Sequence, residues 1–382
     1  MESTKKIRVG ITGQSGFIGS HLYNHLGLDA EHFERVAFCD DFFFDEARLN
    51  CFVKKCDVIV HLAAVNRHQD QTVLYKINIE LVTKLITACE AEQVSPHIIF
   101  SSSIQESNGS LYGKSKIEGR NICTNWAEKN KAFFTGLIIP NVFGEFCKPN
   151  YNSVVATFSY KLVNNETPVI INNSVIPLIY VSTLCKAICE DIKSVNRQKT
   201  AKIKTLEISE DFTMKVSDLL ELFLSFKIMY LDKGIIPMLK NRNEVRLFNT
   251  FRSYINLEKY FPFFLKKNTD ERGMFVETLK LETGGQVSFS ITKAGVTRGN
   301  HFHTRKIERF TVIKGKARIS LRKIGTDKVY SFMLDGDSPA YVDMPIWFTH
   351  NITNIGTEDL YTQFWINEWY DPNDADTFFE EV

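Results

Sequence analysis

Two histidines and a glutamate stand close together in the stretch GNHFHTRKIERF, Gly299–Phe310. His301 and His303 are separated by one residue, so on a strand both side chains face the same side. Glu308 follows in the same stretch, and His350 stands in a second one, PIWFTHNITN. Three imidazoles and a carboxylate suit zinc, iron, manganese or nickel, and the spacing does not choose among them. The same side chains can instead abstract a proton or only fill a core, so the residue types leave three hypotheses open.

Three glycines, Gly13, Gly16 and Gly19, recur in the stretch IRVGITGQSGFIGSHL. They follow a predicted strand and open a predicted helix, which is the context in which this spacing binds a pyrophosphate. Glycine permits a tight turn and close backbone approach, and the helix N-terminus offers free N–H groups and a positive dipole to the phosphates. We therefore expect a dinucleotide site that also includes Phe17 and Ile18.

The expected dinucleotide is NADH or NADPH. An acidic residue about 20 positions after the glycines binds the adenosine ribose and favours NADH, whereas an arginine there accommodates the 2′-phosphate of NADPH. The stretch VAFCDD supplies Asp40 and Asp41 at the end of the second predicted strand, and no arginine is adjacent. The sequence therefore favours NADH, although either aspartate can instead cap a turn.

A tyrosine and a lysine in the stretch SSSIQESNGSLYGKSKIEG, residues 101–119, suit carbonyl reduction. Tyr112 and Lys116 are four residues apart, so on a helix they share a face and the ammonium can lower the pKa of the phenol. Such a phenol can pass a proton to a carbonyl oxygen as hydride arrives from nicotinamide. Ser103, at the end of the preceding predicted strand, can hydrogen-bond the same oxygen. A Tyr-x-x-x-Lys pair alone is usually a solvated helix face, and the glycine motif upstream makes the functional interpretation the better one.

Two kinds of scaffold are needed to position these residues. From Lys6 to about Pro140, short β-branched runs alternate with helical periodicity, which predicts a parallel sheet. Strands are expected at IRVGIT, VAFCD, CDVIVHLAA, HIIFSSS and GLIIP, and helices at LVTKLITACEAE and after Tyr112. From about Asp270, closely spaced short strands between glycine-containing turns predict an antiparallel sandwich or barrel. The fold class is therefore an α/β, Rossmann-type doubly wound sheet followed by an all-β domain.

The N-terminal motifs resemble those of extended short-chain dehydrogenases/reductases that modify sugar nucleotides. The resemblance rests on the glycines, HLAA at 61–64, the serine at 103 and YGKSK at 112–116. It implies that Ser103 orients the substrate, that Tyr112 is the acid/base, and that Lys116 binds ribose while tuning the tyrosine. It also implies a cofactor site that includes Leu62, Ala63 and Ala64.

The C-terminal motifs resemble those of the cupin family, whose fold is a jelly-roll barrel. The run Gly295-x5-His301-x-His303-x4-Glu308-x6-Gly315 matches the family's first motif, and Pro345-x-Trp347-x2-His350-x3-Asn354 resembles the second. The resemblance implies a divalent metal, with zinc the expected one, on His301, His303, Glu308 and His350. Trp347 stands where the family pattern has glycine, so we expect the pocket mouth to be reshaped or partly filled.

A second resemblance gives His301 another role. DERGMFVE at 270–277 and GVTRGNHFH at 295–303 are similar to the cupin-type epimerases of 4-keto-6-deoxy sugar nucleotides. In those enzymes the histidine after the Arg-Gly pair is the base, and here that position is His301. A metal would occupy the lone pair that a base uses, so metal ligand and base are alternatives.

The order of the two halves resembles the bacterial capsule and O-antigen enzymes that reduce UDP-2-acetamido-2,6-dideoxy-4-hexuloses on the way to N-acetyl-L-fucosamine. The stretches HLAAVNR, SSSIQ, KPNYNSVVATF and NEWYDPNDADTFFEEV carry this resemblance. It implies a reductase domain over residues 1–255, a cupin domain over 256–382, and a UDP-linked 4-keto-6-deoxy amino sugar as substrate. The expected activity is C3 epimerisation by the cupin and NAD(P)H-dependent reduction at C4.

Several polar residues are candidates for substrate binding. Position in the resemblance nominates Lys148 toward a phosphate and Asn150, Tyr151 and Asn152 toward sugar or base, together with Arg67, Ser103 and Asn141. An ordinary polar loop is the alternative for the segment around Tyr151. Two other functions stay open: a C4 reductase whose cupin only dimerises and holds substrate, and a sugar-nucleotide sensor without catalysis.

Composition excludes several classes of protein. A length of 382 residues predicts two domains, and a formal charge of +1 with dispersed charged residues argues against a nucleic-acid partner. No apolar run reaches the roughly 18 residues of a membrane span, so we expect a soluble, cytoplasmic protein. Because cupins often pair by strand exchange, we also expect a homodimer, by analogy alone.

Overall fold

The computed structural model describes residues 5–196 and 202–382, and the chain forms two compact units. The first unit comprises the chain up to Val154 together with Asn172–Val216, and the second comprises Val155–Ile171 and Ser217–Val382. Packing therefore groups residues 217–255 with the C-terminal strands. The boundary at 255/256 stays a prediction about where the two family domains meet along the sequence.

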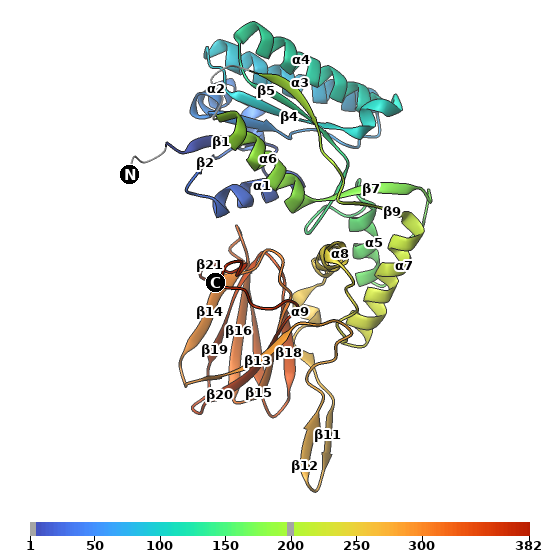
Figure 1. Ribbon diagram of the computed structural model, residues 1–382, viewed down its shortest axis with the longest axis vertical. Coiled ribbons are helices and arrows are strands. Elements are labelled where there is room, and N and C mark those ends of the chain that lie inside the picture. The colour runs from blue at the N-terminus through green and yellow to red at the C-terminus, as the bar shows by residue number, and fades with distance from the viewer. Residues whose placement is uncertain (1–4, 197–201) are drawn as a thin grey trace. The chain divides into compact units, whose positions relative to one another are not determined.

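A six-stranded parallel sheet forms the centre of the first unit (Figure 1). Its order is β2-β1-β3-β4-β5-β8, so β1 lies between β2 and β3. Parallel strands buried on both faces need continuous apolar runs, and Val58–His61 is buried at every position. The strands are β1 Ile7–Thr12, β2 Phe33–Val36, β3 Val58–His61, β4 His97–Ser103, β5 Phe134–Ile139 and β8 Ile203–Glu207.

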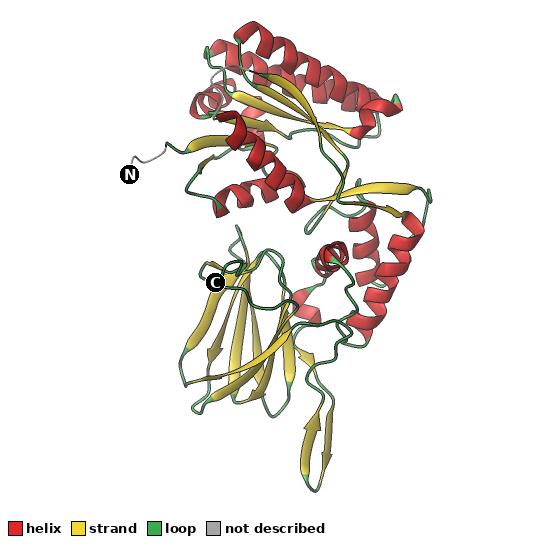
Figure 2. Cartoon of the chain, in the orientation of Figure 1, coloured by secondary structure: helices red, strands yellow, loops and turns green. Residues whose placement is uncertain are grey.

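Helices cover both faces of this sheet (Figure 2), which confirms the predicted doubly wound α/β fold. Helices α1 and α6 pack together, and α3 packs against both α2 and α4. The chain passes from β1 to β2 on one side of β1 and then crosses to β3 on the other side. The strand order therefore reverses at the end of β1, which is the switch point at which such folds bind ligands. The helices are α1 Phe17–Leu28, α2 Glu46–Lys55, α3 Gln71–Ala91, α4 Leu111–Asn130 and α6 Val181–Asn196.

The second predicted strand differs from the observed one. VAFCD was expected to be a strand, but β2 ends at Val36. The chain then leaves the sheet, because the amide of Phe38 donates to the side chain of Gln14 at 3.1 Å instead of to a strand. A 3-10 helix, η1, begins at Asp40 and ends at Phe44.

Short elements complete the first unit. The 3-10 helix η2, Ile104–Asn108, follows β4 directly. A three-stranded mixed sheet has the order β6-β7-β9, in which β7 pairs parallel with β6 and antiparallel with β9. Its strands are β6 Asn141–Phe143, β7 Val175–Tyr180 and β9 Phe212–Lys215.

Two five-stranded antiparallel sheets form the barrel of the second unit and confirm the predicted cupin-type fold. Their orders are β10-β18-β15-β20-β13 and β17-β16-β19-β14-β21. Alternation shapes the strands: in β16, Ala317, Ile319 and Leu321 are buried, whereas Lys316 and Arg318 are exposed. The strands are β10 Phe263–Phe264, β13 Gln286–Thr292, β14 Thr297–Phe302, β15 Glu308–Lys314, β16 Lys316–Lys323, β17 Val329–Asp335, β18 Ala340–Met344, β19 Phe348–Asn354, β20 Leu360–Ile366 and β21 Phe378–Phe379.

Helices and one hairpin complete the second unit. The aromatic rings of Phe223, Phe226, Phe248 and Phe251 pack on one another between α7 and α8. The elements are α5 Val154–Val163, α7 Val216–Phe226, the π-helix η3 Lys227–Asp232, α8 Arg242–Arg252, α9 Leu257–Tyr260, and the hairpin of β11 Lys267–Asp270 with β12 Gly273–Val276. None of the helices in the described part of the chain has both the length and the apolar character that crossing a membrane requires.

A buried ion pair in the barrel also binds a tyrosine from the helical part of this unit. Arg309 of β15 and Asp343 of β18 lie side by side, with Nε to Oδ1 at 2.6 Å and side-chain exposures of 1% and 0%. The hydroxyl of Tyr230, from η3, donates to the other oxygen of Asp343 at 2.6 Å. Asp343 therefore accepts from both the barrel and the helical segment, and it raises the pKa of Arg309 against the opposing effect of burial.

Candidate functional site

The glycine loop lies at the end of β1, at the switch point of the sheet. Gly13 has a φ of +70°, and a Cβ there would lie 2.9 Å from the amide nitrogen of Ala63. A Cβ on Gly19 would lie 2.2 Å from the carbonyl oxygen of Gly13. Gly16 is the N-cap of α1 and has no side chain to satisfy the helix, so the first-turn amides of Phe17 and Ile18 stay available to an anion.

The segments predicted to line the dinucleotide site surround this loop. Asp40 accepts a hydrogen bond from Ser15 of the loop at 2.9 Å, which brings its carboxylate beside the glycines. Asp41 is exposed in the first turn of η1. The amide of Leu62 donates to the carbonyl of Thr12 at 3.2 Å, so the HLAA segment, through Ala64, runs beside the end of β1.

Ser103, Tyr112 and Lys116 lie on consecutive elements. Ser103 is the last residue of β4 and caps η2 by accepting from the amide of Gln105 at 3.2 Å. Tyr112 lies in the first turn of α4, and Lys116 follows one turn later. The Nζ of Lys116 lies 5.6 Å from the Tyr112 ring centroid and donates to the carbonyl of Ser101 at 3.0 Å. This hydrogen bond fixes the ammonium group of Lys116 near the ring of Tyr112.

The pKa of Tyr112 differs from the expectation. Burial raises it to about 12, and the nearby Tyr151 adds to this effect. The sequence predicted that Lys116 would lower it, but desolvation of the phenolate dominates here. Burial also lowers the pKa of Lys116 to about 8, although Glu106 acts in the opposite direction. Tyr112 therefore holds its proton at neutral pH, as a donor to a carbonyl oxygen must.

Four supporting residues were missed by the sequence analysis. Glu106 of η2 accepts two hydrogen bonds from Arg120 of α4, at 3.0 and 2.8 Å, and one from Ser102. This fixes η2 against the helix that carries Tyr112. Asn78 of α3 accepts from the amide of Val65 at 2.7 Å and donates to its carbonyl at 3.1 Å. The available signal was Asn78 itself, a polar residue on the apolar face of a predicted helix.

Some of the substrate-binding candidates lie together. The hydroxyl of Tyr151 accepts from the amides of Asn66 and Arg67 at 3.1 and 3.3 Å. The Nζ of Lys148 lies 5.4 Å from the Tyr151 ring centroid. Since Tyr151 also acts on the pKa of Tyr112, these residues and the predicted acid/base belong to one region.

The other substrate-binding candidates are Asn141, Asn150 and Asn152. Asn141, on β6, donates through its side chain to the carbonyl of Pro177 at 3.1 Å and so supports the neighbouring strand β7. Asn150 has a φ of +55°, which its residue type tolerates, and both Asn150 and Asn152 are exposed. Their substrate roles remain predictions.

In the barrel, a β-bulge orients His301 of β14 and the residue pair that follows it, Phe302 and His303. The register with β19 shifts between Gly299 and His301, and the bulge residue Asn300 has a φ of +60°. A Cβ on Gly299 would lie 2.7 Å from the carbonyl oxygen of His350. After the bulge His301 pairs with His350, and alternation places His303 on the same face as His301.

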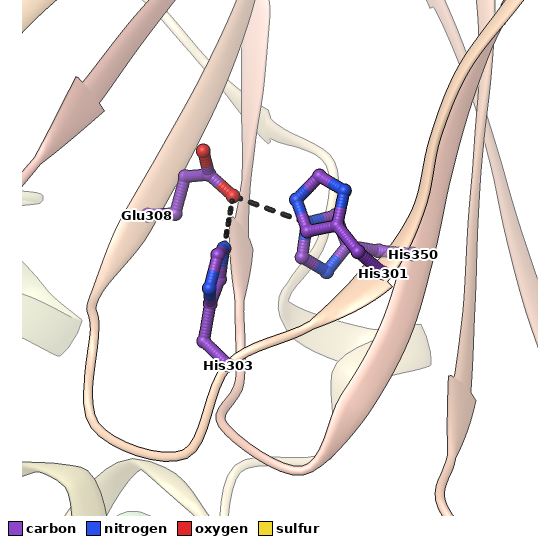
Figure 3. A group of neighbouring side chains, drawn as sticks. All are labelled: His301, His303, Glu308 and His350. Carbon is purple, nitrogen blue, oxygen red and sulfur yellow. Dashed lines mark hydrogen bonds and ion pairs between the residues drawn. The ribbon is translucent and has the colours of Figure 1, made fainter. Parts of the chain in front are cut away.

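His301, His303, Glu308 and His350 converge inside the barrel and are called the barrel cluster below (Figure 3). One donor atom from each of the four lies within 4.8 Å of the others. Glu308 Oε2 lies 3.2 Å from His303 Nε2 and 3.1 Å from His350 Nε2. His303 and His350 are buried, whereas His301 is half-buried. The structure therefore brings together all the residues predicted to bind metal.

Protonation of the rings shows what the barrel cluster can hold. The Nδ1 of His303 lies 2.5 Å from the carbonyl of Asp376, and that of His350 lies 3.2 Å from the carbonyl of Phe348. Because carbonyls only accept, each Nδ1 donates to its carbonyl, and each Nε2 faces the carboxylate of Glu308. A cation satisfies this arrangement, either as a proton on Nε2 or as a metal ion between the rings and the carboxylate. The donor set therefore fits a metal ion.

The electrostatics of Glu308 and His301 agree with this fit, whereas burial, which lowers the pKa of His303, is outweighed by Glu308, so that pKa is raised. Burial raises the pKa of Glu308, but hydrogen bonds from His303 and His350 outweigh burial and hold that pKa far below its usual range. Burial lowers the pKa of His301 to about 4, and the neighbouring rings of His350 and His303 act in the same direction. At neutral pH Glu308 is ionised and His301 is uncharged, which are the forms that bind metal.

Trp347 corrects one expectation. It has a φ of +62°, the left-handed conformation for which the cupin pattern uses glycine. Its ring is 1% exposed and stacks on Phe302 at 5.8 Å between centroids. Phe302 lies between His301 and His303 in the sequence and therefore faces away from them. Trp347 packs behind β14 and does not fill the mouth of the pocket.

The Trp347→Gly variant should be less stable, although glycine suits the backbone. Loss of a buried tryptophan costs about 3–5 kcal/mol, whereas release of left-handed strain recovers only about 1–2 kcal/mol. Urea unfolding at fixed zinc concentration should therefore show a lower midpoint. The control is Trp369→Gly, because Trp369 is 79% exposed and its loss should leave the midpoint near that of the wild type. A Trp347→Gly midpoint equal to or above that of the wild type would contradict the packing role.

Comparison with known proteins identifies the family. Residues 9–203, just over half of the 382, match the NAD dependent epimerase/dehydratase family. The chain belongs to this family. Residues 268–378 match a polysaccharide biosynthesis C-terminal domain, which covers most of the barrel. This NAD dependent epimerase/dehydratase family member is thus an enzyme with a nicotinamide cofactor, in agreement with the glycine loop.

Relatives of this family member match it along nearly its whole length. It is 31% identical over 379 residues to the UDP-2-acetamido-2,6-beta-L-arabino-hexul-4-ose reductase of Pseudomonas aeruginosa, with 97% of this chain and 98% of the relative covered. It is 34% identical to the capsular polysaccharide assembling protein CapF of Staphylococcus aureus, with 98% and 100% covered and a TM-score of 0.61. These matches confirm the predicted relationship to capsule and O-antigen enzymes.

One more distant structure resembles the reductase half in fold. The UDP-glucuronic acid 4-epimerase of Bacillus cereus, solved with UDP-glucuronic acid and NAD, is 16% identical with a TM-score of 0.51. The match covers 58% of this chain and 83% of that one. At this identity it supports the Rossmann-type fold alone.

Proposed function

We propose that this enzyme epimerises a UDP-2-acetamido-2,6-dideoxy-4-hexulose at C3 and reduces it at C4 with NAD(P)H, giving a UDP-N-acetyl-6-deoxy-L-hexosamine. The observation that carries the proposal is the presence of two distinct catalytic groups in one chain. Ser103, Tyr112 and Lys116 lie beside a dinucleotide loop, and the barrel cluster converges in a second fold. The full-length likeness to a UDP-hexulose reductase supports the choice of substrate.

The chemistry of a 4-keto sugar explains why both groups belong together. Its C3 hydrogen is acidic because the adjacent carbonyl stabilises the carbanion, so a base can remove the proton and let it return to the other face. The epimerised ketone can still enolise. Reduction at C4 gives an alcohol whose neighbours are no longer acidic, so the reductase fixes the configuration that the epimerase sets.

The reduction uses the chain's residues in separate roles. Bound nicotinamide supplies the hydride. Tyr112, protonated because burial raises its pKa to about 12, donates a proton to the C4 oxygen. Ser103 hydrogen-bonds the same oxygen, and Lys116 contacts the cofactor ribose. Hydrogen bonding of Asp40 to the glycine loop favours NADH over NADPH, because a carboxylate there binds ribose hydroxyls and repels a 2′-phosphate.

The sugar nucleotide is assigned to the region around Tyr151. Lys148 and Arg67, cations beside this tyrosine, suit the diphosphate. Asn141, Asn150 and Asn152 then contact the sugar or the uracil with their amides. The proximity of Tyr151 to Tyr112 supports this assignment, since the C4 carbonyl must reach the proton donor.

In the barrel, the proposed occupant is a divalent metal, with zinc preferred for three imidazoles and one carboxylate. A metal bound there would polarise a carbonyl oxygen or hold the loop that carries the ligands. Since His301 is then a ligand, proton transfer at C3 falls to another residue. If the barrel cluster works without metal, His301 is the C3 base.

Metal analysis of the purified protein separates these two roles of His301. We expect about one transition metal per chain by inductively coupled plasma mass spectrometry, and much less in the His301→Ala variant. The reason is the convergence of three imidazoles and the Glu308 carboxylate, which together supply the donor set of a metal site. A metal-free wild type that still exchanges the C3 proton would make His301 the base and exclude the metal site.

A homodimer is proposed from two exposed features of the barrel unit. Strand β13 is the edge of its sheet and exposes an apolar row, Val287, Phe289 and Ile291, at 54%, 74% and 43%. The hairpin β11–β12 forms a separate two-stranded sheet and exposes Met274 and Phe275. Exposed apolar edges of this kind are normally covered, and a second copy of the chain is the proposed cover.

Light scattering tests the dimer. The wild type should have twice the 43.9 kDa mass of the chain, and Phe289→Glu should shift the population toward the single-chain mass because a carboxylate cannot be buried unpaired. A wild type at 43.9 kDa at every concentration would overturn this part of the proposal.

The full proposal is tested by incubating the 4-keto sugar nucleotide with the wild type in D2O and NADH. We expect cofactor oxidation together with deuterium at C3. Absence of both cofactor oxidation and C3 deuterium would contradict the proposal. Oxidation without C3 deuterium would favour a second candidate, a C4 reductase whose cupin only dimerises and holds substrate. The Pseudomonas relative is named as a reductase alone, which favours that candidate.

A further inference from the structure

The segment of residues 368–381 lies across the loop that connects β14 to Glu308, and it is called the C-terminal strap below. Its strand β21 pairs with β14, with Phe379 opposite His301 and Phe378 opposite Phe302. Arg305 in the loop binds Glu368 at 3.0 Å and Asp374 at 2.9 Å. The strap therefore contacts both the strand that carries His301 and the loop that leads to Glu308.

Asp376 makes the densest set of contacts in the strap. Its carboxylate accepts from the amides of Thr304, Arg305 and Lys306 at 3.1, 3.0 and 3.0 Å, and from the hydroxyl of Thr304 at 2.6 Å. Asp376 is 6% exposed and has a φ of +43°, an unfavourable conformation for a non-glycine residue. These contacts hold it in that conformation and fix three consecutive amides of the loop.

The backbone of the same residue contacts the barrel cluster. The carbonyl oxygen of Asp376 lies 2.5 Å from Nδ1 of His303, a residue 73 positions earlier in the chain. His350 finds its Nδ1 acceptor two residues away, on the carbonyl of Phe348 in its own strand. The orientation of His303 therefore depends on a distant segment, whereas that of His350 is set locally.

We infer that Asp376 is a positioning residue: its side chain fastens the C-terminal strap to the loop, so that its carbonyl keeps the proton of His303 on Nδ1 and Nε2 free for a cation. This inference rests on the metal site of the proposed function. A carbonyl acceptor on the second ring nitrogen fixes the tautomer and the orientation of a metal-binding imidazole.

The test compares Asp376→Ala and Asp376→Asn with the control Glu380→Ala in the full chain. Glu380 lies in the same strap, and its side chain binds Arg322 at 2.9 Å, far along the chain from His303. Zinc affinity is measured by competition with a chromophoric chelator after the protein has been stripped of metal. Long-range ¹H–¹⁵N spectra of the ¹⁵N-histidine-labelled, metal-free proteins report which nitrogen of His303 carries the proton, and circular dichroism reports folding.

Asp376→Ala should weaken zinc binding by about 10- to 100-fold and should abolish the single Nδ1–H form of His303. Asp376→Asn keeps one acceptor oxygen and should fall between Asp376→Ala and the wild type, so it decides the question if Asp376→Ala does not fold. Glu380→Ala should keep wild-type affinity and tautomer. Wild-type affinity and tautomer in both folded Asp376 variants would overturn the inference, as would an equal loss in Glu380→Ala.

The same measurements distinguish a failure of the proposed metal site from a failure of the inference about Asp376. If the wild type binds no zinc, the proposed metal site is wrong. The tautomer of His303 then decides the inference by itself. An Nδ1–H form in the wild type that is lost in Asp376→Ala upholds the positioning role, and an Nε2–H form in the wild type overturns it.

Discussion

Replacing Tyr112 with phenylalanine should lower kcat for NADH oxidation by about 10²- to 10⁴-fold, the usual contribution of a positioned acid. The phenol is the group that gives its proton to the C4 oxygen, and burial raises its pKa to about 12, so it is protonated at neutral pH. Phenylalanine keeps the ring and removes only the hydroxyl that carries the proton. Steady-state oxidation of NADH with the 4-keto sugar nucleotide measures the effect, and KM should change little.

The control is Tyr75→Phe, which also removes one tyrosine hydroxyl. Tyr75 lies on α3 and donates to Glu118 on the exposed side of α4, away from Lys116. We expect its kcat to equal that of the wild type. If Tyr112→Phe kept more than about a tenth of the wild-type kcat, Tyr112 would not be the acid.

The second large effect concerns the stability of the barrel unit. Asp343→Ala should lower the free energy of unfolding by about 3–5 kcal/mol, the cost of leaving one member of a buried ion pair without its partner. Arg309 and Asp343 are 1% and 0% exposed, and Tyr230 would lose its acceptor as well. Urea unfolding followed by tryptophan fluorescence measures this loss, because Trp347 and Trp365 are both buried in the barrel unit.

Two further variants show that burial is the cause. Asp335→Ala removes an exposed partner of Lys316, 3.8 Å away, and should cost less than about 1 kcal/mol. The double variant Arg309→Met with Asp343→Leu removes both charges and should regain most of the lost stability. A loss in Asp343→Ala no larger than that in Asp335→Ala would contradict the account of the buried pair.

The sequence correctly predicted the structural features that depend on the spacing of nearby residues. The parallel sheet, the glycine loop and the barrel each follow from patterns of a few residues, such as the run from Gly13 to Gly19. The four members of the barrel cluster were predicted to converge because strand alternation and motif spacing are geometric constraints, and their donor atoms lie within 4.8 Å.

Contacts between distant segments could not be predicted in this way. Asp376 acts on His303 across 73 residues, and no periodic pattern connects the two. Trp347 was expected at the pocket mouth because its spacing fits the cupin motif, but its ring stacks on Phe302 on the other side of the strand. Spacing identifies the position, whereas packing decides which way the side chain points.

The electrostatic expectation for Tyr112 failed for a related reason. A lysine one turn away was expected to lower the pKa of the phenol. The Nζ of Lys116 lies 5.6 Å from the ring centroid of Tyr112 and donates instead to the carbonyl of Ser101. Burial therefore governs the pKa of Tyr112. The degree of burial depends on the whole fold and cannot be read from the spacing of two residues.

The central claim is that two chemistries occupy two sites in one chain. It is tested most directly by giving the 4-keto sugar nucleotide to Tyr112→Phe and His303→Ala in D2O with NADH, and by comparing C3 deuterium with cofactor oxidation above an enzyme-free control. The account predicts C3 deuterium without oxidation in Tyr112→Phe, and loss of C3 deuterium in folded His303→Ala. C3 deuterium at the wild-type rate in His303→Ala, or its loss in Tyr112→Phe, would contradict the account.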